Sequence, residues 1–157
     1  MHTLDHALKQ YIAVIRAGLL WFHGAHLASR GAGFSGDHTL LFTEIYEYYE
    51  DQLDAIIEKA IGLTEDECYS SPTKTTEMAL AILKGMPEPH QSNALASVTF
   101  GLQFEEMYIE FVEDMFEMFE NSGELSLGLN DFLAADANKH ESFVYKLRQR
   151  SKTQLEN

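Results

Sequence analysis

Histidine and carboxylate side chains are the residues of this chain whose types and spacing suggest chemistry. His23 and His26 are three residues apart, and His38 follows His26 after twelve residues. Farther along, Asp54 and Glu58 are four residues apart, so a helix would let two carboxylates converge on one cation. Mixed imidazole and carboxylate ligands suit iron or zinc better than calcium. These five residues are therefore candidate metal ligands.

The same residues also have a purely structural interpretation. His23 and His26 continue an apolar stripe, where a histidine is usually a hydrogen-bonded core residue. Asp54 and Glu58 belong to an acidic stripe of the kind that usually forms a solvated helix face. The spacing alone leaves both interpretations open.

Other kinds of chemistry have weaker support. Cys68, the single cysteine, follows three acids at residues 65–67, which predicts a raised thiol pKa and an unreactive sulfur. The chain has no Gly-Xaa-Ser-Xaa-Gly motif and no phosphate-binding loop. A single cysteine also excludes an internal disulfide and is typical of a reducing compartment, so we expect a cytoplasmic protein.

Helices are the elements that would position the candidate ligands. Apolar residues recur at steps of three and four along most of the chain, which indicates amphipathic helices. The long helices are predicted over residues 4–29, 37–63 and 93–121, and from an N-cap at Asn130 onward. Asp37 is the expected N-cap of the second, and a short helix is expected near residues 75–83. The predicted fold is all-α, a single four-helix-bundle domain over residues 1–157.

The charge balance bears on possible partners. A net charge of −14 should repel a polyanion such as DNA and attract cations. Near the end of the chain stands a basic cluster made of Lys146, Arg148, Arg150 and Lys152. One interpretation of this cluster is structural, because the helix dipole favours cations near a helix C-terminus. The other is that the cluster forms a partner-binding tail. No apolar run reaches the length of a membrane span, and residues 1–20 lack the features of a signal peptide.

Three segments resemble the Dps family, the ferritin-like mini-cages that protect DNA during starvation. Residues 26–34 (HLASRGAGF) followed by His38 are similar to the family's histidine, glycine, phenylalanine, histidine run. Residues 54–58 (DAIIE) resemble its Asp-x-x-x-Glu motif, and residues 132–134 (FLA) with 139–148 (KHESFVYKLR) resemble its fourth helix. The resemblance extends over nearly the whole chain in matching order.

This resemblance implies a ferritin-like bundle with a short helix between helices two and three, assembled as a hollow homo-dodecamer. It implies a metal site at a two-fold interface, with His26 and His38 from one chain and Asp54 and Glu58 from its mate. Ferrous iron would be oxidised there, preferably by hydrogen peroxide, and ferric iron stored inside, which protects against oxidative damage. The catalytic residues of this ferroxidase would be His26, Asp54 and Glu58.

The chain departs from the family pattern around the second histidine. In the family, an acid usually follows that histidine by four residues, and here this position is Phe42. If one residue is inserted nearby, the corresponding position is Thr43, which is next to Glu44. The interval from His38 to Asp54 is also one residue longer than in the family. One extra residue turns an α-helix by about 100°, so both residues cannot keep the family's orientation on an unbroken helix. Either the extra residue is absorbed at the helix start or His38 is displaced.

These departures from the family pattern leave alternatives for the metal ligands and for the function. His26, Asp54 and Glu58 are the firmer ligand candidates, and His23 is a substitute for His38. A cage whose oxidation site has decayed would act as a scaffold. Direct DNA binding is disfavoured, because helix one begins without a basic extension. Only the basic cluster near the end of the chain could then contact DNA.

Two further groups of ionisable residues have competing interpretations. Asp136 and His140 are four residues apart and could bind metal inside the bundle, but residues 11–20 supply no carboxylate, which favours a buried hydrogen bond. The acids of the third long helix are interpreted as a solvated face, of which a few near its end could line an iron-entry pore: Glu106, Glu110, Glu113, Asp114, Glu117 and Glu120.

Overall fold

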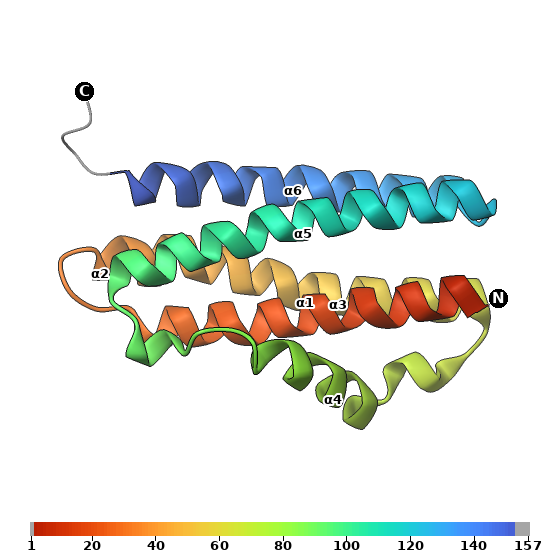
Figure 1. Ribbon diagram of the computed structural model, residues 1–157, viewed down its shortest axis with the longest axis horizontal. Helices are drawn as coiled ribbons and strands as arrows, with labels where there is room; N and C mark the ends of the chain where they lie inside the picture. The colour runs from red at the N-terminus through yellow and green to blue at the C-terminus, as the bar shows by residue number, and fades with distance from the viewer. Residues whose placement is uncertain (1, 153–157) are drawn as a thin grey trace. The chain divides into compact units, whose positions relative to one another are not determined.

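The computed structural model describes residues 2–152, which are helical almost throughout and contain no β-strand. Their elements are α1 (His2–Ala28), α2 (Phe34–Gly36), η1 (Asp37–Phe42), α3 (Thr43–Thr64), η2 (Glu67–Ser70), α4 (Pro72–Leu83), η3 (Pro89–Gln91), α5 (Ala94–Ser122) and α6 (Leu127–Ser151) (Figure 1). The all-α prediction is confirmed. Among the described helices, none has both the length and the hydropathy needed to cross a membrane.

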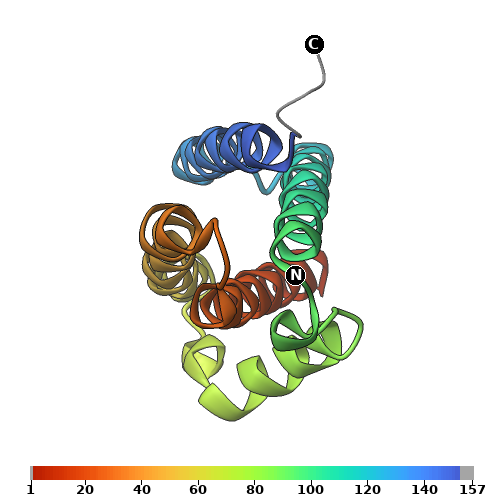
Figure 2. The ribbon, with the colours of Figure 1, turned by 90° about the vertical axis from the view of Figure 1, so that its left-hand side faces the viewer.

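Two compact units make up the chain, and the first covers residues 1–92. Its centre is α1, with α3 on one flank and α4 on another (Figure 2). Residues of α1 at steps of three and four, among them Leu8, Ile12 and Ile15, are fully buried. Phe22 of the same stripe stacks on Tyr49 of α3, with ring centroids 5.6 Å apart. The predicted helical stripe is therefore the core-facing side of α1.

The second long helix starts differently from the prediction. It begins at Phe34 as α2 and continues through η1, a π-helical segment, into α3. Asp37 is buried, has helical angles (φ −65°, ψ −47°), and its N–H already donates to the Gly33 carbonyl at 2.9 Å. The Asp37 N-cap prediction is wrong, because the hydrogen-bond ladder forms one turn earlier.

The connection between α3 and α5 contains the predicted short helix, α4. Ser71 is its N-cap and accepts from the Lys74 N–H, and Pro72 follows at the first helical position, both favoured choices there. After α4, the Trp21 indole N–H donates to the Pro87 carbonyl at 2.9 Å. This bond ties the connection to α1.

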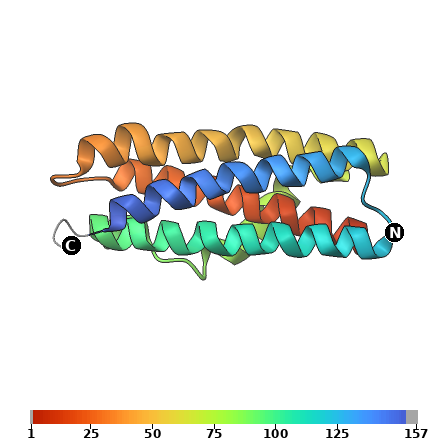
Figure 3. The same cartoon turned by 90° about the horizontal axis from the view of Figure 1, so that it is seen from above.

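The second unit begins at Asn93 and is a hairpin of α5 and α6, which run antiparallel (Figure 3). Asn93 caps α5 by accepting from the Ala96 N–H at 2.8 Å, and Gly123 ends it with φ +74°, as a C-terminal glycine commonly does. Ser126, which accepts from the Leu129 N–H, is the N-cap of α6. Asn130 therefore lies inside the helix, and its predicted capping role is wrong. The single-domain prediction over residues 1–157 stays a prediction.

Candidate functional site

His26 and His38 form a reciprocal pair where α1 ends and the second long helix begins. Their rings stack with centroids 3.9 Å apart and an interplanar angle of 17°. His26 Nδ1 lies 2.8 Å from the His38 carbonyl oxygen, and His38 Nδ1 lies 2.9 Å from the His26 carbonyl oxygen. A carbonyl oxygen can only accept, so each Nδ1 carries the hydrogen.

This pairing decides which ring nitrogen a neutral His26 or His38 offers to a metal ion. In a neutral imidazole with hydrogen on Nδ1, the lone pair is on Nε2, which is then the metal-binding atom. Metal-ligating histidines commonly donate their other N–H to a backbone carbonyl, which orients the ring. The structure therefore brings together two of the predicted ligands, His26 and His38, with Nδ1 of each ring bonded to a backbone carbonyl and Nε2 as the remaining ring nitrogen.

Thr43 joins this pair through its hydroxyl group. Thr43 Oγ1 donates to the His38 carbonyl oxygen at 2.6 Å and lies 2.9 Å from His26 Nδ1. Phe42, by contrast, is buried, with its ring 6.2 Å from that of Phe22. The residue that faces the histidines is therefore Thr43, one position later than an uninterrupted α-helix would place it.

The π segment η1 explains this shift. Its i→i+5 bonds enclose one residue more than those of an α-helix. The segment runs from Asp37, one residue before His38, to Phe42, so most of it lies in the interval between His38 and Asp54. The extra residue in that interval therefore has a place at the helix start, the first of the two explanations offered by the sequence. Single π turns are rare and occur frequently at functional sites.

His23 lies beside this pair without joining its hydrogen bonds in any contact described. It is exposed, and its ring centroid is 4.8 Å from that of Tyr46, which is in turn 5.0 Å from His26. Phe34 also stacks on His38, with ring centroids 4.8 Å apart. The histidines thus lie within one aromatic cluster, which sequence periodicity did not reveal.

Asp54 and Glu58 are exposed on α3, one turn apart. Asp54 follows His38 by sixteen residues, which corresponds to about 24 Å along a helix axis. Within one chain these carboxylates cannot reach the histidines. Consistently, residues 2–152 contain no group of three or more His, Cys, Asp or Glu placed to hold a metal ion. One chain therefore holds the candidate ligands in two separate places, which we call the histidine half-site (His26 and His38) and the carboxylate half-site (Asp54 and Glu58).

A second set of ionisable side chains is buried in the α5–α6 hairpin. His140 Nδ1 is hydrogen-bonded to Glu105 Oε2, and His140 Nε2 lies 3.3 Å from Asp136 Oδ1. Tyr108 donates to Asp136 Oδ2 at 2.6 Å, and its ring stacks on His140 at 3.8 Å. We call these four residues the buried acid–histidine cluster. Both ring nitrogens face carboxylates, so the predicted Asp136–His140 pairing is confirmed as a structural contact.

Sequence analysis missed Glu105, which completes this cluster. Glu105 is fully buried and stands seven residues after Val98 and seven before Val112, both buried on the same helix. An acid in register with an apolar stripe is a signal that could have identified it. Burial disfavours a charged His140, but the charge of Glu105 and the hydrogen bonds to Asp136 and Glu105 outweigh it and raise its pKa to about 9.

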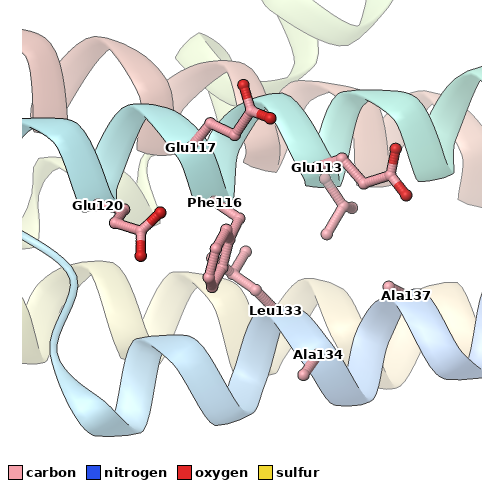
Figure 4. A pocket seen from close by; sticks show the side chains of 8 residues that line it. Glu113, Phe116, Glu117, Glu120, Leu133, Ala134 and Ala137 are labelled. Carbon is pink, nitrogen blue, oxygen red and sulfur yellow. The ribbon is translucent and has the colours of Figure 1, made fainter.

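The remaining acids of α5 lie on its surface. All six acids interpreted as a solvated face are exposed. Three of them, Glu113, Glu117 and Glu120, border a hollow of about 340 Å³ whose other walls are apolar side chains of α5 and α6 (Figure 4). A role in an iron-entry pore stays a prediction.

Two other predicted groups are placed as follows. The Cys68 thiol donates to Asp66 Oδ2 at 3.1 Å, and this bond with the carboxylate raises its pKa, as predicted. Within the basic cluster, Arg148 pairs with Glu106 of α5 at 2.9 Å, and Lys146 and Lys152 are exposed. The basic side chains lie in the last turns of α6 and just beyond it, where the helix dipole favours them.

Comparison with known proteins establishes the fold. No family model and no curated protein matches the chain. Among solved structures, it is similar to Dps from Thermosynechococcus elongatus, with a TM-score of 0.79, 16% identity, and coverage of 98% of this chain and 93% of that one. It is also similar to a DPS protein from Vibrio cholerae O1, described as a member of a broad superfamily of ferritin-like diiron-carboxylate proteins, with a TM-score of 0.76, 18% identity and coverage of 96% and 90%.

Both similarities extend over nearly the whole of each chain. The fold is therefore the ferritin-like fold of Dps proteins, with α4 as the short helix in the crossover, and the predicted resemblance is confirmed at the level of fold.

Proposed function

We propose that this protein is a Dps-like mini-ferritin that binds ferrous iron between two copies of the chain and oxidises it, preferably with hydrogen peroxide. The observation that carries the proposal is the reciprocal pairing of His26 and His38 through Nδ1. When the rings are neutral, this pairing leaves the lone pair of each on Nε2, which is the atom that a divalent metal ion would bind.

The ligand set requires a second copy. Asp54 and Glu58 are exposed neighbours on α3, far from the histidines of their own chain. At a two-fold interface each copy supplies its histidines to one site and its carboxylates to the other. Imidazole and carboxylate together suit iron, and the carboxylates favour the ferric product.

The overall reaction is a balanced electron transfer. Each ferrous ion gives up one electron, and hydrogen peroxide takes two electrons with two protons to form water, so two ferrous ions are consumed per peroxide. Removing both reactants suppresses hydroxyl-radical formation. This is the protective role that we assign to the protein.

Assembly and storage follow from the same proposal. The Dps structures that share the fold support a hollow cage, and we assign this chain a homo-dodecamer that retains ferric iron inside. The net charge of −14 per chain attracts iron cations and disfavours DNA. Protection by removal of iron and peroxide is therefore the function proposed, without direct DNA binding.

The proposal is tested by mixing anaerobic, metal-free protein with ferrous iron and then with hydrogen peroxide, while ferric absorbance is followed. We expect ferric iron to form much faster than in protein-free buffer and to stay in solution with the protein. Bovine serum albumin at equal mass is the control for unspecific iron binding. If an assembled cage oxidises iron no faster than buffer does, the enzymatic role is wrong and the scaffold alternative takes its place.

A further inference from the structure

We propose that Thr43 is a positioning residue whose hydroxyl group acts together with the His38 carbonyl to orient His26 with hydrogen on Nδ1. The inference deepens the proposed function and rests on it in one respect, namely that the Nε2 atom freed in this way serves a metal ion. The assignment of the tautomer itself depends only on contacts within one chain.

The Thr43 hydroxyl group donates one hydrogen bond and accepts another. Thr43 has a single hydroxyl hydrogen, and its oxygen is 2.6 Å from the His38 carbonyl, which can only accept. The hydrogen is therefore on that side, and the lone pairs of Oγ1 are left for His26 Nδ1 at 2.9 Å. The single hydrogen of His26 Nδ1 is thus shared between two acceptors, the His38 carbonyl at 2.8 Å and Thr43 Oγ1 at 2.9 Å, and Thr43 Oγ1–H donates to the His38 carbonyl.

The other tautomer of His26 would break this arrangement. A lone pair on Nδ1 would face the His38 carbonyl oxygen at 2.8 Å, and two acceptors cannot bond. If Thr43 turned its hydrogen toward Nδ1 instead, its own bond to the carbonyl would be lost. Thr43 and the His38 carbonyl therefore select the same tautomer, and His26 has two groups that enforce it.

His38 provides an internal comparison. Its Nδ1 donates to the His26 carbonyl at 2.9 Å, and no contact described joins Thr43 Oγ1 to the His38 ring. Loss of the Thr43 hydroxyl should therefore act on the His26 ring and leave the state of the His38 ring unchanged. This asymmetry distinguishes a positioning role from a general loosening of the region.

The π segment is what brings Thr43 to this place. In an uninterrupted α-helix the residue four positions after His38 would lie beside it, and that residue is Phe42, which is buried in the core. The wider turn at Asp37–Phe42 places Thr43 next to the histidines instead. Insertion of a side-chain group into the helical ladder is a recognised cause of such local distortion.

The test is solid-state 15N NMR of metal-free, sedimented protein labelled at histidine, recorded at alkaline pH where ordinary imidazoles are neutral. Signals of His26 and His38 are assigned by loss in His26→Gln and His38→Gln. Thr43→Val removes the hydroxyl at nearly constant shape, and Thr43→Ser keeps it. Thr39→Val, at an exposed threonine of the same π segment, is the matched control.

We expect hydrogen on Nδ1 of His26 in all four proteins, because the His38 carbonyl still accepts it. In Thr43→Val this N–H loses one of its two acceptors, so the Nδ1 signal of His26 should shift toward that of a weaker hydrogen bond, while Thr43→Ser and Thr39→Val should keep the wild-type signal. His38 should be the same in all four proteins. A Thr43→Val protein whose His26 Nδ1 signal is the same as in the wild type overturns the inference, and so does an equal change at His38.

A separate titration with Co²⁺ addresses the consequence for metal binding. Altered partners behind a ligating histidine typically cost 10- to 100-fold in metal affinity, so we expect Thr43→Val to bind about tenfold more weakly and Thr43→Ser to restore binding. If even the wild type binds no Co²⁺ while the NMR result holds, the proposed function fails and the tautomer assignment stands. If the wild type binds and Thr43→Val binds equally well, the positioning role is refuted.

Discussion

Two variants that are each inactive should regain about a quarter of the wild-type rate of iron oxidation when they assemble together. The first variant, His26→Gln, lacks a ligand of the histidine half-site. The second, Asp54→Asn with Glu58→Gln, lacks the carboxylate half-site. Each alone should oxidise ferrous iron no faster than buffer does, because every site loses the same ligands.

The recovery follows from two-fold symmetry. At such an interface each chain contributes its histidines to one site and its carboxylates to the other. In a mixed pair, one site combines both defects and the other combines intact histidines with intact carboxylates. Random assembly of equal amounts makes about half of the pairs mixed, and half of their sites are intact, which gives about a quarter of all sites.

The measurement is the rate of ferric absorbance after co-expression or joint refolding of the two variants. A mixture of His26→Gln with His38→Gln is the matched control, and it should stay inactive because both defects fall on the histidine half-site. Glu47→Gln with Glu50→Gln, two other exposed acids of α3, should keep the wild-type rate. Correctly assembled mixed particles with no activity would rule out a site divided in this way.

The sequence predicted the long helices well, but it misplaced the first turns of the second and the fourth. The apolar steps in residues 4–29 and 93–121 depend on periodicity over many turns, which one residue cannot disturb. A helix start depends on a few local hydrogen bonds, and at Asp37 and Asn130 other groups supply them: the Gly33 carbonyl in the first case and the Ser126 hydroxyl in the second.

The candidate site was predictable in its residue types but not in its arrangement. His26 and His38 could be named from their spacing. Their reciprocal bonds form where the second long helix begins with a π segment, and no residue pattern in this chain predicts such a segment. In the sequence, Thr43 stood out only as the residue that takes the family's acid position if one residue is inserted after His38. Glu105 was missed because the other acids of the same helix are exposed, and an acid is usually assigned to the solvated face. Its position in the apolar period, which places it in the core, was not considered.

Replacement of His140 by Gln should destabilise the protein strongly at neutral pH and much less at high pH. His140 is fully buried between Glu105 and Asp136, with Tyr108 stacked on its ring. Loss of one partner of a buried ion pair typically costs about 3–5 kcal/mol, since it leaves buried charge without compensation. We expect a loss of this size at neutral pH.

The sign of the pH dependence follows from the direction of the pKa shift. The charge of Glu105 and the hydrogen bonds to Asp136 and Glu105 prevail over burial and raise the pKa of His140 from 6.5 to about 9 in the folded protein. The folded state therefore holds its proton more tightly than the unfolded state. This contribution, about 3 kcal/mol, is complete below the unfolded pKa, is still largely present at neutral pH, and is lost as pH rises through about 9.

Denaturant unfolding at neutral pH and above pH 9 measures both effects as a difference between proteins. The free-energy gap between the wild type and His140→Gln should be large at neutral pH and shrink as His140 of the wild type loses its proton. His90→Gln, at an exposed histidine whose Nδ1 lies 3.6 Å from Glu88, is the matched control and should show a small gap at both pH values. A His140→Gln gap that is equal at both pH values would mean that His140 is not held as a buried cation. The cluster would then stabilise α5 and α6 by packing and neutral hydrogen bonds alone, because only a proton bound more tightly in the folded state makes the gap depend on pH.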